Sequence, residues 1–283
     1  MMFWVLGPVA AEVGLDAFNM SHFAASPSQL EPSRPSERLN FLSAVFGDHM
    51  VLQRAPQQAM LYGFTTPGAT VKTLFDGQAL TSTSDVNGTW RQLLPATDAS
   101  EKAYTIKVAS STGEGASLTD VLFGDVYLCG GQSNMQFALL ATENATEEIQ
   151  IANAYPHIRL FTVGQGTNTP GAQMRDLQTI EQNWSVAANS TIAGGGGFGY
   201  FSSVCWFFGR RLSNYLKEST GATIPLGLVS NNWGGTTVEQ WSPDSAYAVC
   251  NRTQGNNGLY NAMIVPYTVG PFTIKGFTWY QGA

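Results

Sequence analysis

Short apolar runs separated by turn residues fill residues 41–119. The runs are rich in β-branched and aromatic side chains, and turn sequences such as Thr66-Pro67-Gly68 and Asn87-Gly88 lie between them. This pattern predicts strands at 42–46, 60–64, 70–75, 90–94 and 104–109. Short, closely spaced strands are typical of an antiparallel β-sandwich. We therefore expect residues 41–119 to form a β-sandwich accessory domain without evident catalytic residues.

From residue 120 onward, strand-like and helix-like segments alternate at longer spacing. Apolar runs predict strands at 121–129, 157–163, 224–230 and 274–280, and helical periodicity predicts helices at 135–152 and 200–216. Strands that alternate with helices form a parallel sheet flanked by helices, and such sheets bind ligands beyond the carboxyl ends of their strands. The fold class is therefore α/β over residues 120–283. Because no strand is predicted after 274–280, we expect an unpaired edge there.

A single serine follows the first of these strands. Gly130 and Gly131 allow a tight turn, and Ser133 stands at the start of a predicted helix. Free N–H groups and the helix dipole would stabilise negative charge near its oxygen, as a nucleophilic serine requires. The alternative is that Ser133 only caps the helix. Met135 stands where the G-x-S-x-G turn of α/β-hydrolases has its second glycine, so this turn differs from the nucleophile turn of that class.

Two later strand ends carry groups that can bind a developing negative charge. The strand 224–230 leads to Gly234 and Gly235, where the absence of a Cβ lets a backbone N–H approach a reacting oxygen. The last strand leads to Gln281, whose side-chain amide is another possible donor. Alone, a Gly-Gly pair is a common turn and a single Gln means little. Because these groups follow successive strands, we expect them beside Ser133 as parts of an oxyanion hole.

Three sequence blocks resemble those of a known family. The stretch 124–135, which ends in Gly-Gln-Ser-Asn-Met, resembles the first block of the SGNH hydrolases of the sialate O-acetylesterase family. The segment 232–241 is similar to the second block, and Trp-Tyr-Gln-Gly at 279–282 is similar to the third. The stretches 48–56 and 63–71 also resemble the opening of this family, so the resemblance covers nearly everything after the first forty residues.

The resemblance implies an SGNH-hydrolase (flavodoxin-like) parallel sheet and a serine esterase without a cofactor. Ser133 would attack the acetyl carbonyl of an O-acetylated sialic acid or sialoglycan, and water would then release acetate. The backbone N–H groups of Ser133 and of Gly234 or Gly235 would bind the oxyanion, with help from the Gln281 amide.

The same resemblance implies a catalytic His with an Asp partner near the carboxyl end of the domain. This chain has Ala283 where the third block of the family has a glutamate, and it ends there. We therefore expect a partial esterase domain at 120–283, an incomplete sheet, no catalytic His or Asp in the chain, and little or no esterase activity. The three histidines, His22, His49 and His157, are not expected to replace the base, and none shows metal-site spacing.

Composition and charge restrict the partners. Of the 283 residues, 43% are hydrophobic and 12% are charged, and the net charge is −6 without clustered Lys or Arg. This charge argues against nucleic acid or an anionic membrane as a partner. No apolar run reaches the roughly 18 residues that a membrane span needs.

The first forty residues are rich in Ser, Pro and Glu, so we expect 1–40 to be a disordered leader. Residues 1–11 are apolar enough for a signal segment but lack a basic start, so a cleaved and an uncleaved N-terminus both stay open. Glycosylation sequons begin at six positions: Asn19, Asn87, Asn144, Asn183, Asn189 and Asn251. Together these features favour a lysosomal or secreted protein.

The three cysteines cannot all pair with one another. Cys129 and Cys205 lie in apolar runs and are expected to be buried thiols. Cys250 lies in a polar loop and could pair with a group outside the chain.

Two other functions stay open. The chain could be a non-catalytic sialoglycan-binding fragment on an inactive hydrolase scaffold, or an acetylesterase for another acetylated carbohydrate, such as a plant polysaccharide. Trp233 and Trp241 could offer a stacking surface for a sugar, but buried packing is their expected role.

Overall fold

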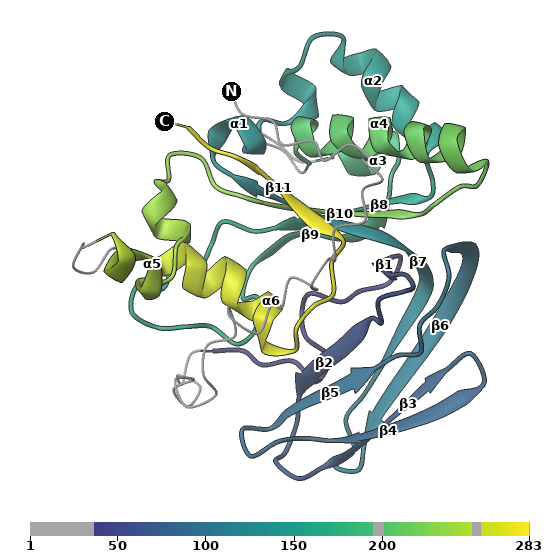
Figure 1. The fold of residues 1–283 in the computed structure, drawn as a ribbon, viewed down its shortest axis with the longest axis vertical. Helices are drawn as coiled ribbons and strands as arrows, with labels where there is room; N and C mark the ends of the chain where they lie inside the picture. The colour runs from purple at the N-terminus through teal and green to yellow at the C-terminus, as the bar shows by residue number, and fades with distance from the viewer. Residues whose placement is uncertain (1–36, 195–200, 251–255, 283) are drawn as a thin grey trace, which may run out of the picture.

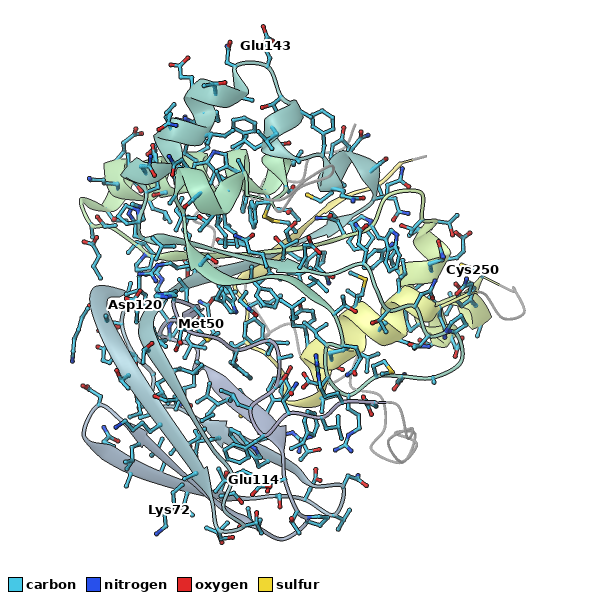
Figure 2. The ribbon with its side chains drawn as sticks, turned by 180° about the vertical axis from the view of Figure 1, so that it is seen from behind. Met50, Lys72, Glu114, Asp120, Glu143 and Cys250 are labelled. Carbon is cyan, nitrogen blue, oxygen red and sulfur yellow. A yellow bond between two sulfur atoms is a disulfide. The ribbon has the colours of Figure 1, made fainter. Side chains whose placement is uncertain are left out.

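The computed structural model describes residues 37–194, 201–250 and 256–282. Within these residues, a strand-rich layer lies below a sheet that carries helices on both sides (Figure 1). Seen from behind, side chains fill the space between the two layers, where Met50 is fully buried (Figure 2). The predicted signal segment, His22, Asn19 and Asn251 lie outside the described residues.

The lower layer contains two antiparallel groups of strands. One is the pair of β2 (Met60–Phe64) and β5 (Thr89–Leu93); in the other, β3 (Thr70–Phe75) lies between β4 (Gln78–Thr83) and β6 (Ser100–Ser110). Buried residues alternate with others along β3, as expected for a strand with one face toward a core. The predicted strands 60–64 and 70–75 are confirmed, whereas β4 was not predicted because its sequence is mostly polar.

Residues 42–46 form bends and turns, so the strand predicted there is wrong. The buried carboxylate of Asp176 accepts hydrogen bonds from the Ser43 hydroxyl at 2.6 Å and from the Ala44 N–H at 2.9 Å. It also accepts one from Asn40 Nδ2 at 2.9 Å, at the end of the predicted leader. A side chain more than 130 residues away therefore directs the backbone here, and no local pattern reports it.

One strand, β7 (Gly115–Gly131), runs through both layers. It pairs antiparallel with β6 at its start and parallel with β10 (Leu226–Asn232) and β11 (Gly276–Tyr280) at its end. β1 (Val51–Gln53) pairs in parallel with its middle part. The predicted boundary between residues 119 and 120 lies inside this 17-residue strand, so the division into two domains stays a prediction.

The upper sheet has the strand order β11-β7-β10-β8-β9, with β8 (Ile158–Val163) and β9 (Ile180–Val186) at one side. All neighbours are parallel except β8 and β9, which are antiparallel. The predicted α/β class is therefore confirmed, although β9 was not predicted. Among the described residues β11 pairs only with β7, so it forms the expected edge.

Helices cover both faces of this sheet (Figure 1). α2 (Ala145–Ile151) and α4 (Ser203–Thr220) lie on one face, and α5 (Asp244–Val249), a π-helix (Tyr260–Ile264) and α6 (Val265–Val269) lie on the other. The remaining helical segments are short: α1 (Ser133–Gln136), α3 (Asn189–Ile192) and the 3-10 turns Leu139–Ala141, Ala152–Ala154 and Val238–Trp241. In the described part of the chain, no helix is long and apolar enough to cross a membrane.

The continuous helix predicted at 135–152 is wrong. After α1, Ala138 is extended and forms a bridge with Ser202. The carbonyl of Phe137 accepts hydrogen bonds from both the N–H and the hydroxyl of Ser203, each at 2.8 Å. The first turn of α4 therefore holds this segment in an extended form, and α2 begins only after Asn144, whose φ of 56° is left-handed.

Cys129 and Cys205 form a disulfide with a Cα–Cα distance of 5.8 Å. The prediction that they are buried thiols is therefore wrong about their chemistry, although both are buried. The bond joins the end of β7 to the first turn of α4 across 76 residues, a contact that local sequence cannot report. Cys250 is free and exposed at the end of α5, far from Met50 and Asp120 (Figure 2).

Candidate active site

The carboxyl ends of three strands meet at one edge of the upper sheet. In the strand register, Gly131 of β7 lies between Asn232 of β10 and Tyr280 of β11. Hydrogen bonds continue past the strand ends, because the Trp233 N–H donates to Gly131 O at 3.1 Å and the Gln132 N–H donates to Tyr280 O at 3.2 Å. The three chemical groups predicted from sequence therefore emerge from adjacent strands.

Ser133 is the first residue of α1, and its side chain is exposed. The residue that precedes the helix is Gln132, whose side chain makes no capping hydrogen bond. The alternative that Ser133 is only a helix cap is therefore wrong. Within the described ranges, the Ser133 hydroxyl has no hydrogen-bond partner, which leaves its oxygen open to an incoming group.

Gly234 lies directly against the serine. A Cβ placed on Gly234 would be 3.4 Å from both Cα and Cβ of Ser133. The Gly234 N–H donates a hydrogen bond to Oε1 of Gln136 at 2.7 Å. Gly235 has a φ of 74° and open space around its Cα, so it supplies the left-handed step of the turn.

Gln281, which follows β11, binds the loop after β10. Its Nε2 donates to Thr236 O at 2.9 Å, and its Oε1 accepts the Trp279 indole N–H at 3.1 Å. The amide that sequence analysis assigned to the oxyanion hole is therefore bound to the loop after β10 in this structure.

The aromatic residues around this loop mainly support it. Trp241 is buried, donates its indole N–H to Thr236 Oγ1 at 2.9 Å and packs edge-on against Trp279. Trp233 is partly buried against the same core. The expectation that Trp233 and Trp241 act in packing is confirmed, while Trp279 is 37% exposed.

The two described histidines lie near the amino ends of the parallel strands, at the opposite end from Ser133. His157 precedes β8, whose first residue, Ile158, aligns through Leu226 with Asp125 of β7. Asp125 is six residues before Gly131, which corresponds to about 20 Å along a strand. The Nε2 atom of His157 lies 2.8 Å from Ser213 Oγ, and burial lowers the pKa of the imidazole.

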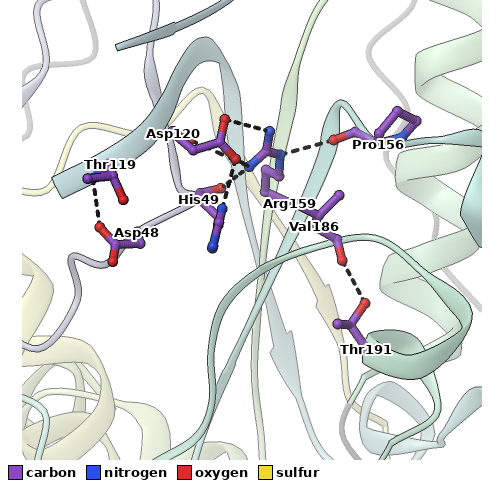
Figure 3. A network of polar contacts seen from close by, with 8 residues as sticks. All are labelled: Asp48, His49, Thr119, Asp120, Pro156, Arg159, Val186 and Thr191. Carbon is purple, nitrogen blue, oxygen red and sulfur yellow. Dashed lines mark hydrogen bonds and ion pairs between the residues drawn. The ribbon is translucent and has the colours of Figure 1, made fainter. Parts of the chain in front are cut away.

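His49 belongs to a polar network at the junction of the two layers (Figure 3). Its Nδ1 lies 2.8 Å from Asp120 Oδ2, and Arg159 donates to the same carboxylate oxygen at 2.6 Å. Burial alone would raise the pKa of Asp120, but hydrogen bonds from Arg159 and His49 and their positive charge hold it below its ordinary value. This network connects β7 with β8 and is remote from Ser133.

Sequence analysis missed one polar residue at the site and one buried polar residue in β10. Gln136 binds Gly234, as described above, and its position three residues after Ser133 was a usable signal because such residues share one side of a helix. Asn231 is fully buried and donates to Met263 O in the π-helix at 2.9 Å, while its Oδ1 has no partner among the described residues. Nothing in the local pattern marked Asn231.

Other predicted sites lie on the surface. Four sequon asparagines fall within the described residues and are all exposed: Asn87, Asn144, Asn183 and Asn189. The described ranges contain no group of three His, Cys, Asp or Glu side chains placed to hold a metal ion.

Comparison with known proteins identifies the family of this chain. The model of the carbohydrate esterase family described as sialic acid-specific acetylesterase matches residues 123–283. Sialate O-acetylesterase from Homo sapiens is 37% identical over 266 residues, which cover 86% of this chain and 48% of that protein. Sialate O-acetylesterase from Rattus norvegicus is 34% identical over 286 residues, which cover 83% and 50%.

A solved structure shows the same fold. The crystal structure of a carbohydrate acetylesterase from Xanthomonas citri matches with a TM-score of 0.71 and 32% identity, over 87% of this chain and 52% of that one. The chain thus spans about half the length of the relatives that it matches. Because the family model covers more than half of the 283 residues, the chain belongs to the sialic acid-specific acetylesterase family of carbohydrate esterases.

Proposed function

We propose that this chain carries the nucleophile and the oxyanion-binding groups of an esterase that removes O-acetyl groups from sialic acids. The observation that carries the proposal is that Gly234 packs against Ser133 where three strand ends meet. A Cβ built on Gly234 would lie 3.4 Å from the Cβ of Ser133. An open serine hydroxyl beside a glycine backbone is suited to acyl transfer. The named activity of the mammalian relatives supports the substrate.

In the proposed reaction, the Ser133 oxygen attacks the acetyl carbonyl carbon and its proton passes to a general base. Backbone N–H groups of Ser133 and of Gly234 or Gly235 stabilise the oxyanion, with Gln281 holding the loop or contributing its amide. The bond from the carbonyl carbon to the sugar oxygen breaks, and the sugar oxygen takes up the proton. Water then attacks the acetyl-serine and releases acetate.

We also propose that this 283-residue chain by itself hydrolyses esters slowly or not at all. His49 and His157 lie at the far edge of the sheet, so neither can be the base for Ser133. Loss of one member of a catalytic triad costs on the order of a thousandfold or more but leaves residual catalysis. A hydrolysis rate for an acetyl ester within tenfold of ordinary esterases, abolished in Ser133→Ala, would contradict this.

Reaction with a fluorophosphonate, followed by mass mapping of the labelled peptide, tests the nucleophile. We expect slow label on Ser133 in the wild type and in Ser245→Ala, which removes another exposed serine, and no label in Ser133→Ala. If the wild type is labelled equally on Ser133 and Ser245, or is not labelled on Ser133, the proposal is wrong.

The second candidate is an acetylesterase for a different carbohydrate, and the similar structure from Xanthomonas citri favours it. Acetate release from O-acetylated sialic acid compared with acetylated xylan separates the two substrates. The third candidate is a non-catalytic sialoglycan-binding protein. Calorimetric binding of an O-acetyl sialoside without acetate release, unchanged in Ser133→Ala, would favour that reading over both enzymes.

We propose a lysosomal or secreted location. The Cys129–Cys205 disulfide fits an oxidising compartment, and the four exposed sequon asparagines are accessible to glycosylation. Expression in secreting animal cells should give a protein whose mass falls after glycosidase treatment. An unmodified protein with reduced cysteines would contradict this location.

A further inference from the structure

The Gly234 N–H is already occupied by the Gln136 side chain. Gln136 is the last residue of α1 and stands three positions after Ser133, so both side chains leave the same side of the helix. Its Oε1 accepts the Gly234 N–H at 2.7 Å. Because a backbone N–H can only donate, the carboxamide must present its oxygen to it.

The position of this oxygen relates it to the proposed reaction. A Cβ on Gly234 would lie 2.8 Å from Gln136 Oε1 and 3.4 Å from Cβ of Ser133, so the carboxamide oxygen lies next to the nucleophile turn. Donors of an oxyanion hole lie about 2.7–3.1 Å from the oxyanion. The 2.7 Å contact of Oε1 with the Gly234 N–H falls within this range. Oε1 of Gln136 thus occupies the backbone donor of Gly234, which is one of the donors that the proposed reaction assigns to the oxyanion.

We infer, as an extension of the proposed function, that Gln136 is a positioning residue that fills the oxyanion hole until a substrate displaces it. The carboxamide satisfies the Gly234 N–H and keeps the loop after β10 against α1 while the site is empty. A tetrahedral oxyanion carries more charge than an amide oxygen, and charge-assisted hydrogen bonds are roughly twice as strong as neutral ones. The transition state therefore displaces Gln136, at the cost of one neutral hydrogen bond.

Substitutions at Gln136 should change the reactivity of Ser133 in opposite directions. In fluorophosphonate labelling, the Ser133 oxygen bonds to phosphorus, fluoride leaves and the serine proton passes to solvent. Gln136→Ala and Gln136→Asn remove or shorten the occupant, so we expect labelling to accelerate by about fivefold, the factor for one neutral hydrogen bond. Gln136→Glu keeps the size but binds the N–H more tightly and repels the oxyanion, so labelling should slow by about tenfold.

Three controls keep the test specific. Gln150→Ala, on exposed α2, should leave the labelling rate unchanged. The Gly234 amide should exchange with solvent faster in Gln136→Ala and Gln136→Asn than in the wild type and Gln136→Glu, a change that a remote structural effect would not produce. The slowing in Gln136→Glu should decrease as the pH falls below about 4, because protonation of the introduced carboxyl removes its charge.

The outcomes separate this inference from the proposed function. Label on wild-type Ser133 with no acceleration in Gln136→Ala and Gln136→Asn overturns the role of Gln136 and leaves the nucleophile in place. If these two variants do not fold, an unchanged labelling rate in the equally large Gln136→Glu overturns it. Absence of label on Ser133 in every variant overturns the proposed function, and the role of Gln136 falls with it.

Discussion

At the residue scale, the turn before Ser133 depends on backbone space. Gly131 has a φ of 139°, and a Cβ there would lie 2.2 Å from Tyr280 O. A Cβ on Gly130 would lie 2.5 Å from the ring of Trp279. The two glycines therefore permit the turn itself and also let β11 lie close to β7. This close approach of β11 brings the third strand end to the site.

Gly131→Ala should destabilise the protein by on the order of 3 kcal/mol, because the added methyl meets backbone atoms and the φ is unfavourable for alanine. Gly282→Ala is the matched control, since nothing lies within 4 Å of a Cβ there. Urea unfolding followed by tryptophan fluorescence measures both. Equal midpoints for the two variants would show that β11 adjusts without cost.

At the element scale, β7 and α4 hold the nucleophile turn between them. The disulfide fixes β7 at Cys129, four residues before Ser133, to the first turn of α4. The same turn of α4 binds the carbonyl of Phe137, just after α1. The short helix that carries Ser133 is therefore anchored on both sides to a single longer helix.

Replacing both bonded cysteines by alanine should lower the free energy of unfolding by about 4 kcal/mol, the loop-closure value for a bridge of this length. The bridge spans 76 residues. Cys250→Ala should leave stability unchanged because that cysteine is free and exposed. Denaturation of the wild type with and without a reductant checks the result, and a reductant-independent midpoint would contradict it.

At the scale of the whole molecule, two ion-pair groups connect the layers. Arg54 donates two hydrogen bonds to the buried carboxylate of Asp125, each at 2.9 Å, and so fixes the segment after β1 to β7. At the amino end of β8, Arg159 and His49 both bind Asp120 (Figure 3). The layers are thus joined by charged contacts as well as by the core around Met50.

Asp120 should make the stability depend on pH in the acid range. Its pKa in the folded state lies below the ordinary value of 3.8, so its contribution is present above about pH 4 and is lost as the pH falls through the folded-state pKa. Asp120→Asn should therefore lower the midpoint of thermal unfolding at pH 6. Between pH 5 and pH 3, however, the midpoint of this variant should fall by fewer degrees than that of the wild type.

Asp76→Asn is the control for this pH dependence, since Asp76 forms an exposed ion pair with Lys102 that contributes little. It should follow the wild type at each pH. Parallel melting curves for the wild type and Asp120→Asn from pH 6 to pH 3 would show that the junction does not depend on the charge of Asp120.

The candidate site was predictable because its groups follow strands of one parallel sheet. Ser133, Gly234 and Gln281 each come within four residues of the end of an apolar run, and the carboxyl ends of parallel strands must share an edge. What these groups bind was not predictable in this way. Gln281 holds Thr236, and Gly234 is bound by Gln136 across 98 residues, so both contacts depend on side chains that meet only after folding.

The sequence by itself determined the class of the fold, most of the strands and the turn that presents Ser133, because hydrophobic periodicity and glycine act locally. Only the tertiary structure decided that β7 serves both layers, that residues 42–46 are not a strand, and that Cys129 pairs with Cys205. It also decided that the α-helix predicted at 135–152 is interrupted between α1 and α2. These features result from contacts between residues far apart in the chain. Their free energies outweigh local preference, and no short stretch of sequence records them.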